Sequence, residues 1–159
     1  MSRTIGRIAT GAAGLTAAAA VAVSLPAELA AATSGSGASS EVIAQGTTAD
    51  QVHVQSTGPT RMVFQRVTIQ PGGYTGWHWH PGPLLVVVEQ GTLTHYDRHC
   101  GVQTYGAGDA FEELSGSNEV HMGANHGSDD VVLDVTYVLP ADATLREDAP
   151  APGCAAEIS

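Results

Sequence analysis

Short apolar runs separated by glycine and proline dominate the hydrophobic pattern of the chain beyond residue 60. The segment 61–70 is β-branched and aromatic and ends at Pro71-Gly72-Gly73, which is typical of a strand followed by a turn. The run 84–89 has the composition of a buried strand, and Gln90-Gly91 after it suits a hairpin. We predict strands at 42–45, 51–55, 61–70, 77–80, 84–89, 92–96, 120–124 and 131–139, and helical character only at 141–148.

This series of short strands with glycine and proline turns favours an all-β fold, a single-domain antiparallel β-barrel or jelly roll. Removing residues 1–32 from the 159 of the chain leaves 127, which is the length of one domain. Within it we predict a flexible leader with the first short strands at 33–59, the barrel at 60–140 and a C-terminal tail at 141–159.

The N-terminal segment has the pattern of a secretory signal peptide. Arg3 and Arg7 precede an alanine-rich apolar run at 8–25, and Ala30-Ala31-Ala32 supplies small residues for cleavage. The alternative is an uncleaved membrane anchor, but the run is short and weakly apolar for a helix that needs ~20 apolar residues to span a membrane. We therefore predict a signal peptide at 1–32, a secreted protein and no stable membrane association.

Both cysteines, Cys100 and Cys154, lie in the segment predicted to be exported. In an oxidising compartment two such cysteines usually pair. A bond between them would tie down the tail and contribute ~4 kcal/mol by the loop-entropy estimate.

The net charge of the chain is −10, and the sequence contains no lysine. Phosphate contacts need Lys and Arg, so we expect no nucleic-acid partner. The sequence leaves a homodimer open.

Two histidines lie two residues apart in the predicted strand 77–80. Side chains at i and i+2 of a strand point to one face, so His78 and His80 could bind one metal ion. A chance His-x-His is the alternative, but a Pro-Gly-Pro turn and an apolar run follow the pair, as in a site inside a barrel.

The spacing from Gly72 through His78-x-His80 to Gly91 resembles the first motif of the cupin superfamily, although Leu84 stands at its glutamate position. The stretch 106–125 resembles the second motif, with Gly108-Asp109 at its opening and His121-x3-Asn125 at its close. Leu114 stands at the proline position of this motif, and the spacing from Gly116 to His121 is two residues longer. The sequence around 76–83 most resembles small secreted single-domain cupins of actinobacterial type.

The resemblance implies that His78, His80 and His121 hold a divalent transition metal ion, one of Fe, Mn, Ni, Cu or Zn. For the missing acidic ligand we rank Glu119 first, because it would share a strand face with His121. Glu112 and Glu113 are the alternatives. Two further histidines, His95 and His99, flank a predicted turn and are expected to be solvated.

Two functions follow from these residues. One is a metal-dependent oxygenase, isomerase or lyase that acts on a small molecule, as the resemblance to cupins implies. The other is a non-catalytic module that binds a small ligand beside a degenerate metal site, which the missing glutamate favours. The sequence assigns no catalytic residue.

Overall fold

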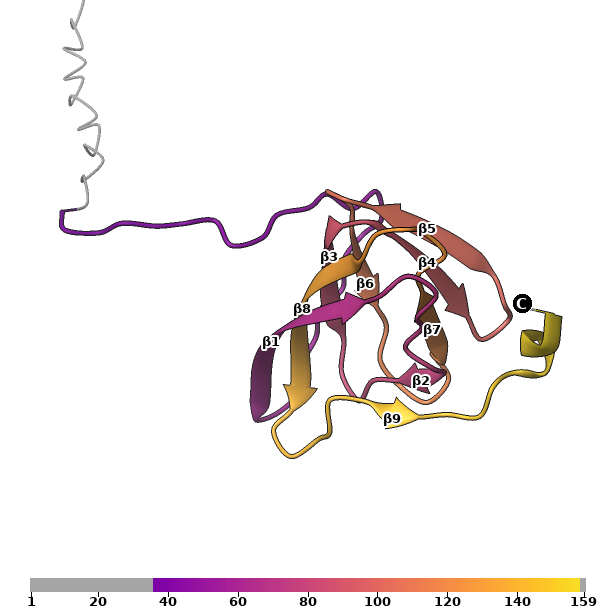
Figure 1. Cartoon of the computed structure of the whole chain (residues 1–159). Coiled ribbons are helices and arrows are strands. Elements are labelled where there is room, and N and C mark those ends of the chain that lie inside the picture. Colours follow the sequence, from indigo (N-terminus) through magenta and orange to yellow (C-terminus); the bar gives the residue numbers. More distant parts are fainter. Residues whose placement is uncertain (1–35, 158–159) are drawn as a thin grey trace, which may run out of the picture. The chain divides into compact units, whose positions relative to one another are not determined.

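The computed structural model describes residues 36–157. Among these residues, a pair of antiparallel sheets forms a barrel, so the all-β fold class is confirmed (Figure 1). One sheet has the order β1-β8-β3-β6 and the other has the order β5-β4-β7-β2-β9. The strands are β1 (Thr60–Ile69), β2 (His78–Trp79), β3 (Leu84–Gln90), β4 (Thr92–Asp97), β5 (Val102–Gly106), β6 (Ala110–Glu113), β7 (His121–Ala124), β8 (Val131–Pro140) and β9 (Glu147–Asp148), and a 3₁₀ helix spans Gly153–Glu157.

The main core lies on the inner face of the first sheet. Alternate residues of β8 are buried, as expected when one face of a strand packs against a core. The alternating residues Leu84, Val86 and Val88 of β3 are at most 2% exposed. Burial of these aliphatic side chains is the main contribution to stability, at roughly 1.5–3 kcal/mol for each fully buried side chain.

The hairpin predicted at Gln90-Gly91 is wrong, because β3 pairs with β6 and β8 whereas β4 lies in the other sheet, so the tight turn at Gly91 carries the chain from one sheet to the other. Gly91 has a φ of 78°, a region that side chains other than glycine disfavour. A Cβ at this position would also lie 2.7 Å from the carbonyl oxygen of Asp130. Glycine is therefore required here both by backbone conformation and by space.

Several predicted elements are wrong. The segments 42–45 and 51–55 form no strands; this region contributes only an isolated bridge between Thr47 and Asp109. Segment 141–148 is not helical, because its end pairs with β2 as the short strand β9. We also missed β5 and β6, whose polar and acidic residues hide the alternation that marks a strand.

The predicted disulfide between Cys100 and Cys154 is confirmed, with an S–S distance of 2.04 Å. It ties the end of the tail to the turn between β4 and β5, while β9 adds the middle of the tail to the edge of the second sheet. The domain boundaries at 33–59, 60–140 and 141–159 stay predictions.

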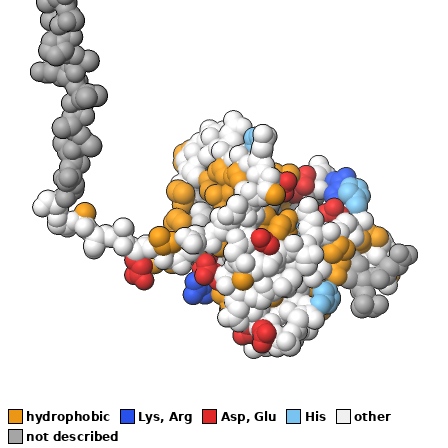
Figure 2. All heavy atoms as spheres, turned by 90° about the horizontal axis from the view of Figure 1, so that it is seen from above, with side chains coloured by type: hydrophobic (Ala, Val, Ile, Leu, Met, Phe, Trp, Pro, Cys, Tyr) orange, Lys and Arg blue, Asp and Glu red, His pale blue; other side chains and the backbone are white. Residues whose placement is uncertain are grey.

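The predicted signal peptide at 1–32 lies outside the described residues. Among residues 36–157, no helix is long and apolar enough to cross a membrane. On the face drawn in Figure 2, carboxylate side chains are spread over the surface and basic side chains appear at only a few places. This distribution agrees with the acidic composition.

Candidate metal centre

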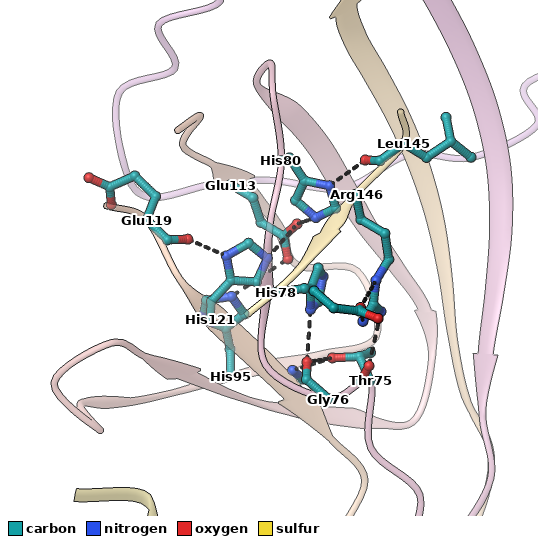
Figure 3. A network of polar contacts seen from close by, with 12 residues as sticks. Thr75, Gly76, His78, His80, His95, Glu113, Glu119, His121, Leu145 and Arg146 are labelled. Carbon is teal, nitrogen blue, oxygen red and sulfur yellow. Dashed lines mark hydrogen bonds and ion pairs between the residues drawn. The ribbon is translucent and has the colours of Figure 1, made fainter. Parts of the chain in front are cut away.

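The structure brings His78, His80 and His121 together inside the barrel (Figure 3). His78 lies directly opposite His121 where β2 pairs with β7, and His80 follows two residues after His78. One ligand atom from each of the three side chains lies within 4.8 Å of the others. All three side chains are buried. Thus the two-residue spacing and one cross-strand pair together build a cluster of three imidazoles.

A backbone carbonyl fixes the orientation of each ring. The Nδ1 atoms of His78, His80 and His121 lie 2.8, 2.7 and 2.8 Å from the carbonyl oxygens of Gly76, Leu145 and Glu119. Since a carbonyl can only accept, each Nδ1 must carry the hydrogen and donate it. In the neutral ring this leaves the lone pair on Nε2, which is the arrangement found in histidines that bind metals.

Glu113 supplies a carboxylate that faces these nitrogens. Its Oε2 lies 3.2 Å from His80 Nε2 and 3.3 Å from His121 Nε2. Both Nε2 atoms are buried and have no hydrogen-bond partner. With both rings neutral, acceptor lone pairs would face one another away from water, which is unfavourable unless a cation or a proton lies between them.

The position of Glu113 explains how a carboxylate reaches the histidine cluster although the first motif has no glutamate at position 84. Leu84, at the glutamate position of the first motif, lies directly opposite Glu113 in the pairing of β3 with β6. Opposite residues in an antiparallel pair project from the same face of the sheet. A glutamate at 113 therefore reaches the same region of the barrel interior that a glutamate at 84 would reach.

Our expectation that His95 is solvated is wrong. Its side chain is 14% exposed, and its Nε2 lies 3.5 Å from Oε1 of Glu113. Its ring stacks on that of His121, with centroids 5.2 Å apart and an angle of 26° between the planes. The alternation of side chains along the predicted strand 92–96 could have indicated that His95 is buried, because His95 lies on the same strand face as the buried Leu93.

The structure does not bring the carboxylate of Glu119 into the cluster. Glu119 contributes its backbone carbonyl to His121, and its side chain points away in Figure 3. Our argument from a shared strand face does not apply here, because β7 begins only at His121. Glu112 instead accepts the backbone N–H of His53. The other predicted histidine, His99, is exposed.

The electrostatics of the cluster follow from burial and from the Glu113 charge. Burial is the largest influence on His78 and lowers its pKa to about 4. Burial alone would raise the pKa of Glu113, but its contacts with His121, His80 and His95 outweigh it and hold that pKa well below the usual range. Burial also acts to lower the pKa of His121, and Glu113 reverses this effect, so the pKa of His121 is raised.

These shifts predict that metal binding releases a proton. Without metal, His121 keeps its proton up to a raised pKa, whereas a metal ligand must be neutral. His78 is already neutral above about pH 4 and releases none. Near pH 6.5 we therefore expect metal binding to release protons, measured as the dependence of the calorimetric binding enthalpy on the ionisation enthalpy of the buffer.

Glu113→Gln is the matched control for this experiment. It removes the charge that raises the pKa of His121, so burial should leave the ring neutral and proton release should fall. A binding enthalpy of the unsubstituted protein that is the same in all buffers at pH 6.5 would contradict the prediction.

A cavity of about 230 Å³ lies beside the cluster. His78, His80 and Glu113 line it together with aliphatic side chains of the core, such as Leu84 and Val135. Such a space is large enough for a small organic molecule.

Two polar groups also line this cavity. The Tyr137 ring packs edge-on against His80, with centroids 5.7 Å apart. The guanidinium of Arg146, from the tail, donates to the carbonyl of Thr75 and to Asp148. A ligand in the cavity would therefore meet a phenol and a cation as well as the cluster.

Residues 65–138 match the sequence profile of the Cupin_2 family, described as a cupin domain. No curated protein matches the chain. The family match, together with the two-sheet barrel and its cluster of histidines, supports the cupin superfamily for this domain.

Among solved structures, the chain is similar to an uncharacterised conserved protein with a double-stranded β-helix domain from Klebsiella pneumoniae, at 25% identity and a TM-score of 0.45 over 60% of this chain and 75% of that one. A predicted oxalate decarboxylase from Thermotoga maritima shows 25% identity and a TM-score of 0.42 over 49% of this chain and 66% of that one. The polyketide cyclase RemF from Streptomyces resistomycificus shows 17% identity and a TM-score of 0.48 over 63% of this chain and 70% of that one.

Proposed function

We propose that this chain is an exported cupin-domain protein that binds one divalent transition metal ion through His78, His80 and His121. The observation that carries the proposal is the convergence of three buried imidazoles, of which His80 and His121 have Nε2 atoms without a hydrogen-bond partner. Imidazole nitrogens with a carboxylate suit Fe, Mn, Ni, Cu and Zn, and the ring orientations leave Nε2 free for the ion.

For the acidic ligand we now propose Glu113 instead of Glu119. The carboxylate of Glu113 already lies against two of the three imidazoles, whereas Glu119 contacts His121 only through its backbone. A carboxylate in this place also offsets part of the ion's charge, which lowers the cost of burying that charge.

The reaction class that we propose is that of an oxygenase, isomerase or lyase acting on a small molecule in the cavity beside the ion. A bound ion would supply Lewis-acid or redox chemistry at this place. The residues of the chain would bind and orient the substrate: aliphatic side chains exclude water, and the Tyr137 and Arg146 side chains supply polar character to the cavity wall.

A non-catalytic module that binds a small ligand is the second candidate. The observation that favours it is the cavity wall, where aliphatic side chains predominate beyond the candidate metal ligands, Tyr137 and Arg146. Metal-dependent turnover of a small molecule would distinguish between the two candidates, since only the enzyme would show it.

Export is supported by the disulfide, since such bonds form and persist in oxidising compartments. We further propose that the protein is of the small secreted actinobacterial type, with a mature chain that begins near Thr33. A homodimer stays a prediction.

The experiment that tests the metal site is metal analysis of the mature chain after removal of metal by a chelator and incubation with each ion in turn. We expect one equivalent of at least one transition metal ion to remain bound after gel filtration. A protein that retains none of Fe, Mn, Ni, Cu or Zn would overturn the proposal.

A further inference from the structure

We propose that the centre contains a second metal position, formed by His95, Glu113 and His121, which shares two of its ligands with the first position. This inference rests on the proposed metal binding. One ion would be bound at a time, either at the inner position, which includes His78 and His80, or at the outer position, which includes His95.

The ligand atoms of the outer group satisfy the same distance limit as the inner trio of histidines. One atom each from His95, Glu113 and His121 lies within 4.8 Å of the others. The Nε2 atoms of both histidines are buried without a hydrogen-bond partner, although a carboxylate oxygen lies 3.3–3.5 Å from each. A buried nitrogen that faces an acceptor needs a cation or a proton, and this holds on the His95 side as it does on the inner side.

The two oxygens of Glu113 serve different histidines, and this divides the cluster into two positions. Oε2 contacts His80 and His121, whereas Oε1 contacts His95. Among the described residues, no group of three ligands within 4.8 Å combines His95 with His78 or His80. An ion bound by His95 would therefore occupy a different place from one bound by the inner pair.

His121 makes the two positions mutually exclusive. His121 belongs to both groups of candidate ligands. Its Nδ1–H donates a hydrogen bond to the carbonyl of Glu119, so only the lone pair on Nε2 can bind an ion. A single lone pair binds a single ion. We therefore expect a total stoichiometry of one ion per chain with either position in use.

The surroundings of the two positions differ. The outer trio lines a second cavity of about 550 Å³, whose other lining residues include Asp97, Arg98, His99 and Glu119. His78 and His80 line the smaller cavity, with its aliphatic wall. A hydrated ion at the outer position would keep polar neighbours for its remaining waters, whereas the inner position offers an ion less polar surroundings.

The experiment uses Co²⁺ as the probe, because its visible absorption reports the set and geometry of its ligands. In the mature chain, His78→Ala/His80→Ala removes the inner position and leaves the outer trio. We expect this variant to bind one Co²⁺ with a visible spectrum different from that of the unsubstituted protein. Adding His95→Ala should then weaken Co²⁺ binding at least tenfold, which corresponds to about 1.4 kcal/mol.

His99→Ala in the same double variant is the matched control, because His99 is exposed and lines the same outer cavity without belonging to the trio. It should leave Co²⁺ affinity unchanged within threefold. If the alanine variants do not fold, as judged by circular dichroism, the same comparison is made with His78→Gln/His80→Gln.

The outcomes separate the two proposals. If the unsubstituted protein binds no Co²⁺ or other transition metal ion, the proposed metal binding fails, and this inference fails with it. If the unsubstituted protein binds Co²⁺ but the folded double variant does not, only the inference is overturned. The inference is also overturned, and the proposed metal binding is not, if the double variant binds Co²⁺ equally well with and without His95.

Discussion

His121→Ala is expected to abolish tight metal binding, with a larger loss than any other single substitution in this chain. His121 is the one histidine that belongs to both groups of candidate ligands, so no neighbouring imidazole can replace it. Losing a residue that merely orients a ligand typically costs 10- to 100-fold in metal affinity. Loss of a ligand should exceed that range, and calorimetric titration with Zn²⁺ would measure it.

His53→Ala is the control for this experiment. His53 is exposed, and its contact with Glu112 is made by the backbone N–H, which the substitution retains. Its Zn²⁺ affinity should equal that of the unsubstituted protein. If His121→Ala binds Zn²⁺ as tightly as the unsubstituted protein, the metal site lies elsewhere and the proposed function loses its basis.

Replacing both cysteines, as Cys100→Ser/Cys154→Ser, is expected to lower the free energy of unfolding by about 4 kcal/mol, since the bond closes a long loop in the unfolded chain. The positions are 54 residues apart in the sequence. Denaturant unfolding of the metal-free protein would measure this loss. A change below about 1 kcal/mol would contradict the estimate, and adding a reductant to the variant, which should change nothing, is the control.

The same double substitution should also weaken metal binding. The tail that the disulfide anchors carries Leu145, whose carbonyl accepts the Nδ1–H of His80, and β9, which pairs with β2 beside His78. A looser tail would hold these rings less firmly, so we expect a loss within the 10- to 100-fold range of an orienting residue. Unchanged Zn²⁺ affinity in the folded variant would show that the tail is not needed to orient the ligands.

Local sequence patterns determined much of this protein. The two-residue spacing predicted that His78 and His80 meet at one site, although β2 ends at Trp79, and apolar runs placed β1, β3, β4 and β8 within one residue of their observed bounds. These features depend on neighbours a few positions apart, so they are visible along the chain. The pairing of Cys100 with Cys154 was also predictable, because the chain contains no other cysteine.

Only the tertiary structure decided which carboxylate and which further histidine lie at the cluster. Leu84 showed that the usual glutamate is missing, but the opposing residue, Glu113, is set by the register between β3 and β6, which are joined by a long connection. Glu119 was ranked first by a strand period that does not apply outside β7, and His95 was set aside because its partners come from other strands. Cross-strand register is fixed by the packing of whole faces against the core, and single-sequence spacing does not contain that information.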